Sequence, residues 1–272
     1  MKLKKIAYIL LGALCLTTLS CDPVDENDRL IYVKPADVKR CVLLEDFTGQ
    51  RCVNCPEAAK VIEQLQAEYG EEAIIAVGIH GGELAVNGKN SAIGLGTDTG
   101  NEYYAAVGEP ALPAGRIGRV GNATTRDQWH TMVYNHIQLP TPLSITASCQ
   151  YDEEARLAKI DVSTLGIEAT TGKLQVWLVE DNITALQFMP DNTHNADYVH
   201  NHVFRTAVNG TWGEDFAVAE GETKNCSFTT VINDKWVAEN LSAVVFVYND
   251  GGVQQVTKAK LIAPADENKT DE

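Results

Sequence analysis

A pair of cysteines, Cys52 and Cys55, lies between two segments of different pattern, and this arrangement constrains the fold more than any other feature of the chain. Residues 41–47 form a short apolar run that fits a buried strand, whereas residues 56–69 place apolar side chains at a helical period behind a proline. Residues 73–79 fit a second buried strand. Strand, cysteine pair, helix and strand in this order predict a βαβ unit with parallel strands.

The place of the pair at the start of a helix has a chemical consequence. Amide N–H groups and the helix dipole at that end stabilise a thiolate. Cys52 is therefore the expected attacking sulfur and Cys55 the resolving thiol, with the positive charge of Arg51 beside the nucleophile. Two other uses of the spacing stay open: a metal site, for which the sequence offers no second ligand pair, and a purely structural disulfide.

The first residues are typical of an exported chain. Three lysines precede an uncharged apolar stretch, residues 6–19, that is too short to span a bilayer comfortably. Residues 1–20 are therefore expected to be a signal peptide. The cysteine that follows, Cys21, resembles the acylated cysteine of a bacterial lipoprotein precursor, and simple cleavage is the alternative. Residues 21–38 would then be an acidic tether between membrane and fold.

Charge excludes one class of partner. The chain has 37 acidic against 22 basic residues, a formal net charge of −15, and no cluster of Lys and Arg that could bind phosphates. No nucleic acid is expected as a partner. The expected partners are the membrane, through a lipid on Cys21, and exported proteins that carry thiols or disulfides.

A change of pattern at residues 139–142 divides the chain into two predicted domains. The first covers residues 39–139. After the break, six stretches separated by turns predict strands, which suggests an antiparallel β-sandwich of immunoglobulin type over residues 143–264. Within it, residues 182–221 are expected to be a long, irregular connection. Residues 265–272 are expected to be a disordered tail.

Other reactive side chains lie in the second half. Cys149 and Cys226 fall in predicted strands and either form a disulfide or stay as free thiols. The histidines His194, His200 and His202 are interpreted as surface or hydrogen-bonded groups rather than metal ligands, because no acid or cysteine stands at ligand spacing. Their place in the long connection would also suit a binding loop or a contact with the other domain.

The segment DFTGQRCVNCP, which begins at Asp46, resembles the active-site segment of the thioredoxin superfamily. That family has a buried aspartate six residues before the first cysteine, which assists proton removal from the second, and Asp46 stands at this spacing. The family also has a cis-proline before the next strand, packed against the disulfide, and Pro113 is the matching residue. The chain departs from the family at Arg51, where a tryptophan is usual. The resemblance implies a thioredoxin-like α/β first domain.

A narrower resemblance covers nearly the whole mature chain. The segments LLEDFTG-x-x-C-x-x-CP and LPAG-x-I-x-R, then HNHVFR from His200 and GTWGE from Gly210, resemble the Omp-twenty-eight-related outer-membrane lipoproteins of Bacteroidetes. That family pairs a thioredoxin-like domain with an immunoglobulin-like β domain. The resemblance implies a lipid-anchored protein of the cell outer membrane that faces either the cell surface or the periplasm.

The chain supports two functional hypotheses of different classes. In the first it is a thiol–disulfide oxidoreductase of the envelope, with Cys52 as nucleophile, Cys55 as resolving thiol and Asp46 as proton acceptor, while Pro113 shapes the substrate groove. In the second it is a surface binding or adhesion protein in which the cysteine pair is a static disulfide. Neither hypothesis calls for a cofactor or a metal.

Overall fold

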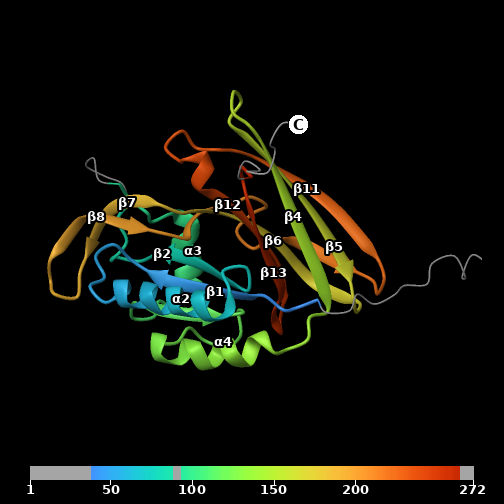
Figure 1. Cartoon of the computed structure of the whole chain (residues 1–272), viewed down its shortest axis with the longest axis horizontal. Helices are drawn as coiled ribbons and strands as arrows, with labels where there is room; N and C mark the ends of the chain where they lie inside the picture. Colours follow the sequence, from blue (N-terminus) through green and yellow to red (C-terminus); the bar gives the residue numbers. More distant parts are fainter. Residues whose placement is uncertain (1–37, 88–92, 264–272) are drawn as a thin grey trace, which may run out of the picture. The chain divides into compact units, whose positions relative to one another are not determined.

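A computed structural model of the chain describes residues 38–87 and 93–263 (Figure 1). The predicted signal peptide, Cys21, the tether as far as residue 37 and the predicted tail lie outside these residues. Within the described ranges, no helix is both long and apolar enough to cross a membrane.

The βαβ unit predicted around the cysteine pair is confirmed. Strands β1 (Val42–Thr48) and β2 (Ile74–His80) run parallel, and helix α2 (Cys55–Tyr69) connects them. Pro56 lies in the first turn of α2, where its missing amide N–H costs no hydrogen bond. Both strands are buried along their whole length, because the sheet is covered on both faces, and such strands read as continuous apolar runs.

Helices cover the two faces of this part of the sheet (Figure 1). On one face α2 and α4 (Trp129–Ile137) pack against β1 and β2, and a short 3₁₀ turn, η2 (Arg126–Gln128), leads into α4. On the other face lies α3 (Asp98–Ala106), whose buried Tyr103 packs against Trp177. The first half is therefore layered as helix, sheet and helix.

Strand β3 (Ala114–Ile117) pairs antiparallel with β1 and comes very close to α4. A Cβ atom on Gly115 would overlap the buried indole of Trp129. We expect Gly115→Ala to lower the free energy of unfolding by about 1–3 kcal/mol, because the ring has no room to yield. Urea unfolding measures this, and Gly78→Ala is the control, since its Cβ would meet nothing nearer than 3.7 Å. Equal stability of the two variants would contradict the tight contact.

One sheet runs through both halves of the chain. Its strand order is β13-β12-β6-β9-β2-β1-β3, with β10 also paired to β6. The strands that follow β3 in this sheet are β6 (Thr170–Glu180), β9 (Val203–Ala207), β10 (Glu214–Val218), β12 (Leu241–Asn249) and β13 (Gly252–Lys260). The two predicted domains are thus not built on separate sheets, because β9 lies between β2 and β6 and joins them.

A second, three-stranded sheet covers part of the first one. It consists of β4 (Leu143–Asp152), β5 (Leu157–Gly166) and β11 (Thr223–Val231), and a 3₁₀ turn, η3 (Ala238–Asn240), precedes β12. Strand β6 alternates between two cores: Val176 and Leu178 face the three-stranded sheet, whereas Trp177 faces α3. The six strands predicted after residue 142 are confirmed, and the second half is a β-rich, two-sheet structure.

The irregular connection predicted over residues 182–221 is wrong. That segment contains β9, β10 and a hairpin of β7 (Ile183–Phe188) and β8 (His194–His200). The four strands are short, and β8, most of whose residues are exposed, lacks the apolar alternation that marks a strand in sequence. Strand β9 meets β2 at a single residue pair, Gly78 and Val203.

Candidate functional site

The cysteine pair is joined in the structure. Cys52 and Cys55 form a disulfide with their Cα atoms 5.4 Å apart. Cys55 is the first residue of α2, and Cys52 lies in the turn before it, as the sequence predicts. Both residues are nevertheless buried, with 3% and 4% of their surface exposed. A protein partner therefore reaches the sulfur atoms only if the covering segment moves.

The covering segment is the β7–β8 hairpin, which is fastened to the turn that carries the disulfide. Gln187 Nε2 donates to the carbonyl oxygen of Cys52 at 2.9 Å. The backbone N–H of Phe188 donates to the Gln50 carbonyl at 2.8 Å, and Gln50 Nε2 donates to the Leu186 carbonyl at 3.1 Å. Gln50 and Gln187 are both buried. These hydrogen bonds fasten the hairpin to the turn that carries the pair.

Loosening this fastening is expected to expose the disulfide. Gln187→Ala removes the donor to Cys52 and to the Phe188 carbonyl, and each buried hydrogen bond lost costs about 1–3 kcal/mol. We expect glutathione to reduce the disulfide about tenfold faster in this variant, because the hairpin opens more often. Gln138→Ala, which removes an exposed side chain bonded to Tyr134 on α4, is the control. An unchanged reduction rate in Gln187→Ala would contradict a hairpin that covers the pair.

Asp46 occupies the position that the resemblance to thioredoxins implies. It lies on β1 with 5% of its surface exposed, and its Oδ1 atom has no hydrogen-bond partner among the described residues. Burial raises its pKa from 3.8 to about 7. Asp46 and Cys55 line the same small cavity of about 80 Å³. The structure thus brings a carboxyl group that can gain or lose a proton near neutral pH close to the second cysteine.

The other two predicted site residues are Pro113 and Arg51. The Leu112–Pro113 peptide bond is cis, as predicted, and β3 follows it and pairs with β1. Arg51 has an exposed side chain, and its backbone N–H donates to the Leu84 carbonyl at 2.9 Å. The roles of Pro113 and Arg51 in catalysis remain predictions.

The structure adds two buried histidines that the sequence did not place near the pair. His80 and His200, with 4% and 6% of their surface exposed, line the cavity that contains Asp46 and Cys55. Their rings lie edge to face with centroids 5.5 Å apart. Burial lowers the pKa of both imidazoles, that of His200 to about 4, so both rings are neutral at neutral pH. The sequence could have predicted the position of His80. His80 pairs with Thr48 on the neighbouring strand, and Thr48 points to the same face of the sheet as Asp46, two residues before it.

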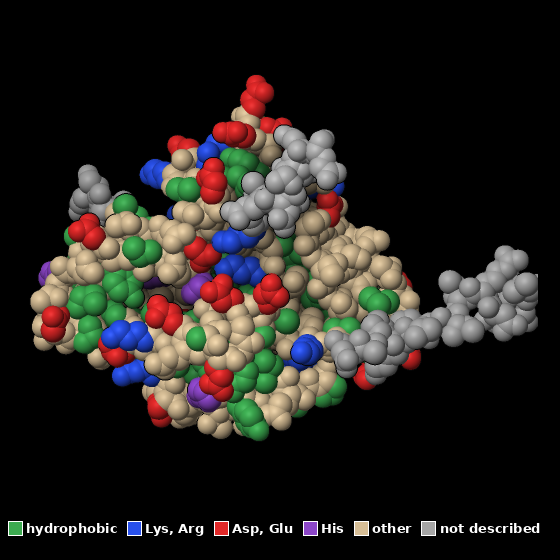
Figure 2. Space-filling model, viewed as in Figure 1, with side chains coloured by type: hydrophobic (Ala, Val, Ile, Leu, Met, Phe, Trp, Pro, Cys, Tyr) green, Lys and Arg blue, Asp and Glu red, His purple; other side chains and the backbone are tan. Residues whose placement is uncertain are grey.

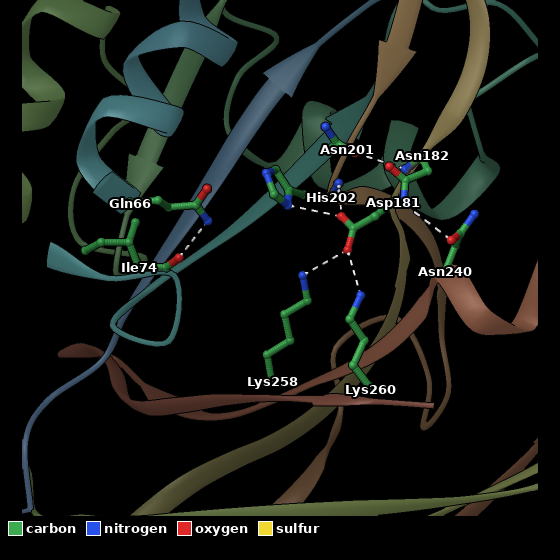
Figure 3. A network of polar contacts seen from close by, with 9 residues as sticks. All are labelled: Gln66, Ile74, Asp181, Asn182, Asn201, His202, Asn240, Lys258 and Lys260. Carbon is green, nitrogen blue, oxygen red and sulfur yellow. Dashed lines mark hydrogen bonds and ion pairs between the residues drawn. The ribbon is translucent and has the colours of Figure 1, made fainter. Parts of the chain in front are cut away.

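A larger polar groove of about 840 Å³ opens next to the small cavity, and the two share Glu63, Asn201 and His202 in their walls. Asp181 lies in this groove between His202 and two lysines (Figure 3). Its Oδ2 atom is 3.3 Å from both Lys258 Nζ and Lys260 Nζ. In Figure 2, basic side chains lie in a hollow in the middle of the face shown, with acidic side chains beside them.

The Asp181 network is a cross-link between strands. Burial alone would raise the pKa of Asp181, but hydrogen bonds from His202 and the charge of Lys258 outweigh it and hold that pKa well below its usual range. The ion pairs with Lys258 and Lys260 tie the β6–β7 turn to β13. The backbone N–H of His202, which donates to Asp181 Oδ1 at 2.7 Å, ties the same turn to the segment between β8 and β9. The groove is wider than the cavity at the disulfide, and the cysteine among the described residues that line it is the half-buried Cys41.

The predicted alternative of a Cys149–Cys226 disulfide is wrong. Both thiols are free, and β5 lies between the strands that carry them. Residues two strands apart are about 10 Å from each other, beyond the range of about 4.4–6.8 Å between Cα atoms that a disulfide spans. Burial raises the pKa of Cys149 to about 11 and also raises those of Cys226 and Cys41. These three thiols therefore stay protonated at neutral pH, which makes them poor nucleophiles.

The three histidines in residues 182–221 have different surroundings. His194 is exposed and stacks on Phe188 with ring centroids 3.9 Å apart, and His202 is paired with Asp181, both of which fit the interpretation as surface or hydrogen-bonded groups. His200 instead contacts the first half through His80. No group of three or more His, Cys, Asp or Glu side chains in residues 38–87 and 93–263 is arranged to hold a metal ion.

Comparison with known proteins gives the family. Residues 100–264, more than half of the chain, match the family of outer membrane protein Omp28. The chain belongs to the Omp28 family. It is accordingly a protein of the cell outer membrane. The matched residues begin after Cys55. The match therefore shows the family of this protein but says nothing about the chemistry of the cysteine pair.

Two solved structures resemble this Omp28-family protein. HBP35 of Porphyromonas gingivalis is 15% identical with a TM-score of 0.65, and the alignment covers 88% of this chain and 81% of that one. That likeness shows a shared β-rich fold. A domain of the outer membrane lipoprotein Omp28 from Porphyromonas gingivalis is 29% identical over 46% of this chain and 92% of its own, with a TM-score of 0.33. No curated protein matches the chain.

Proposed function

We propose that this Omp28-family protein exchanges disulfides with exported proteins in the outer envelope through Cys52 and Cys55. In this proposal residues 39–139 form a thioredoxin-like α/β domain, and residues 143–264 form an immunoglobulin-like sandwich that shares its sheet. The observation that carries the proposal is the buried carboxyl of Asp46, which lies with Cys55 in one cavity and whose pKa burial raises to about 7. A group of this kind suits proton transfer to and from a thiol at neutral pH.

The exchange proceeds in two steps. A substrate thiolate attacks Cys52 Sγ and the Cys52–Cys55 bond breaks, while Cys55 leaves as a thiolate and takes the proton of Asp46. The second substrate thiolate then attacks the substrate sulfur of the mixed disulfide and releases Cys52. Two electrons pass from the substrate dithiol to the pair, and the reverse sequence reduces a substrate disulfide. Both directions need the β7–β8 hairpin to move away from Cys52.

Trapping the mixed disulfide tests the proposal. In Cys55→Ser the resolving thiol is absent, so glutathione disulfide is expected to leave glutathione on Cys52, which intact-mass measurement and peptide mapping detect. Cys52→Ser is the matched variant, and it should react at least about tenfold more slowly, because in this proposal Cys52 is the attacking sulfur and Cys55 only resolves the mixed disulfide. Glutathione found on Cys41, Cys149 or Cys226 but not on Cys52 would overturn the proposal.

The burial of both sulfur atoms favours a second candidate. Here the chain is a surface binding protein, and the Cys52–Cys55 disulfide only fixes the turn below the β7–β8 hairpin. Opening so small a loop would cost about 2 kcal/mol of stability. Under this candidate, Cys55→Ser gains no glutathione in the folded protein, although it does so after denaturation. In either case Cys21 is the proposed site of the lipid anchor, at the end of the signal peptide.

A further inference from the structure

The cavity beside the disulfide is lined by polar atoms with nothing to bond. Asp46 Oδ1, His80 Nδ1 and His200 Nε2 are all buried and have no hydrogen-bond partner among the described residues. A buried polar atom left without a partner destabilises the fold, and ordered water is the usual partner where protein groups supply none. Three such atoms around about 80 Å³ form a polar space large enough for ordered water. The residues come from β1, β2 and β8, so the covering hairpin supplies one of them.

The same cavity adjoins the solvent-exposed groove. Glu63, Asn201 and His202 line both spaces, and His202 is two residues beyond His200 in the chain. In Figure 3, His202 points toward Asp181, and Asn201 lies beside Asn182. A line of polar groups therefore leads from Asp46, which is 5% exposed, to the groove.

We propose that His80 and His200 relay protons between Asp46 and the groove, through water in the cavity that they share with Cys55. This proposal rests on the exchange function proposed above. A proton enters one imidazole nitrogen while the other nitrogen releases a proton to the next group, so each ring returns to its neutral form. No electrons move in the relay. The relay supplies Asp46 with the proton for Cys55 while the hairpin is closed, before the hairpin moves and a substrate thiolate attacks Cys52.

The charges around the cavity suit neutral imidazoles. The titratable or charged groups that face it are Asp46, Glu63, Tyr198, His80, His200 and His202, with Arg205 acting on His80 from outside. Burial, then His200 and Arg205, lower the pKa of His80 well below its usual value. Burial and then the charges of Glu63 and Asp46 raise the pKa of Tyr198, so the phenol keeps its proton. His80 and His200 thus remain able both to accept and to donate.

The relay predicts a pH signature. At about pH 6 Asp46 already holds the proton that Cys55 needs, whereas at about pH 8.5 most molecules must receive it during the reaction. We expect dithiothreitol to reduce the disulfide of His80→Gln and of His200→Gln as fast as that of the wild type at about pH 6. At about pH 8.5 they should be at least about tenfold slower. The redox potential of the pair should not change, because a relay alters the path of the proton and not the end states.

The experiment follows single-turnover reduction of the full-length protein by stopped flow. His130→Gln is the control, because its ring is exposed, is paired with Glu68 and does not line the cavity. If the wild type is not reduced without denaturant, the exchange function fails and the relay with it. If the wild type is reduced and traps glutathione on Cys52, but both variants match His130→Gln at both pH values, the relay alone is wrong. Should His80→Gln fail to fold, His200→Gln in the surface hairpin decides the matter.

Discussion

Replacing Asp46 by asparagine is expected to raise the free energy of unfolding by about 4 kcal/mol at about pH 8 and to leave it nearly unchanged at about pH 4. The pKa of this carboxyl rises from 3.8 to about 7 in the folded protein because it is buried. The folded state therefore binds a proton that the unfolded state has released between these two values. Stability is lost as the pH rises through this window, at about 1.4 kcal/mol per unit. Asparagine, which never ionises, escapes that loss.

Urea unfolding at a series of pH values measures the effect, with Asp234→Asn at an exposed turn as the matched control. The same Asp46→Asn variant should exchange disulfides about a hundredfold more slowly, since it can neither give a proton to Cys55 nor take one from it. A gain in stability together with a loss of rate is the expected mark of a functional buried acid. An Asp46→Asn protein that is no more stable at about pH 8 than the wild type would show that burial does not raise the pKa of this carboxyl to about 7.

Breaking the ion pair between Glu45 and Arg119 is expected to cost about 3–5 kcal/mol of stability. Arg119 Nη2 lies 2.9 Å from Glu45 Oε1, and the two side chains are 6% and 3% exposed. The guanidinium also lies 5.0 Å from the centre of the Trp177 ring and 4.8 Å from that of Phe246. Glu45→Met would leave this cation among aromatic rings without its carboxylate, and Arg119→Met would leave the carboxylate alone.

A double-mutant cycle tests the pair. Removing both charges at once with Glu45→Met and Arg119→Met should recover most of the loss, because well-packed apolar side chains often replace a buried ion pair at little cost. Thermal and urea unfolding of the two single variants, the double variant and the wild type give the coupling energy. Additive losses in the double variant would mean that each residue stabilises the protein through its own contacts instead.

The sequence predicts those parts of the fold whose signal is local. Residues 41–47 and 73–79 become β1 and β2 within a residue, since strands buried on both faces show as apolar runs. Helix α2 begins at Cys55, one residue before the predicted start, because Pro56 marks its first turn. The burial of Asp46 was foreseen only through a family resemblance, as nothing in its immediate neighbours requires it.

The features that escaped prediction depend on contacts between distant segments. Strand β9 is recognisable only once β2 and β6 lie on either side of it, and β8 has few apolar residues because most of its surface faces solvent. The cover over Cys52 comes from Gln187, far along the chain. His200 was expected to be a surface or hydrogen-bonded group, whereas the hairpin carries it inward against His80. A sequence pattern shows whether a segment has the period of a helix or of a strand, but it does not show which distant segment will pack against it.

The most direct test of the proposed exchange is the redox potential of the Cys52–Cys55 pair. The purified protein is equilibrated in glutathione buffers of known ratio, and alkylation mapping reports the oxidised fraction of the pair apart from Cys41, Cys149 and Cys226. We predict a potential between about −270 and −120 mV, within the range of disulfides that exchange with cellular thiols. A potential below about −300 mV would mark a structural disulfide and would contradict the proposal.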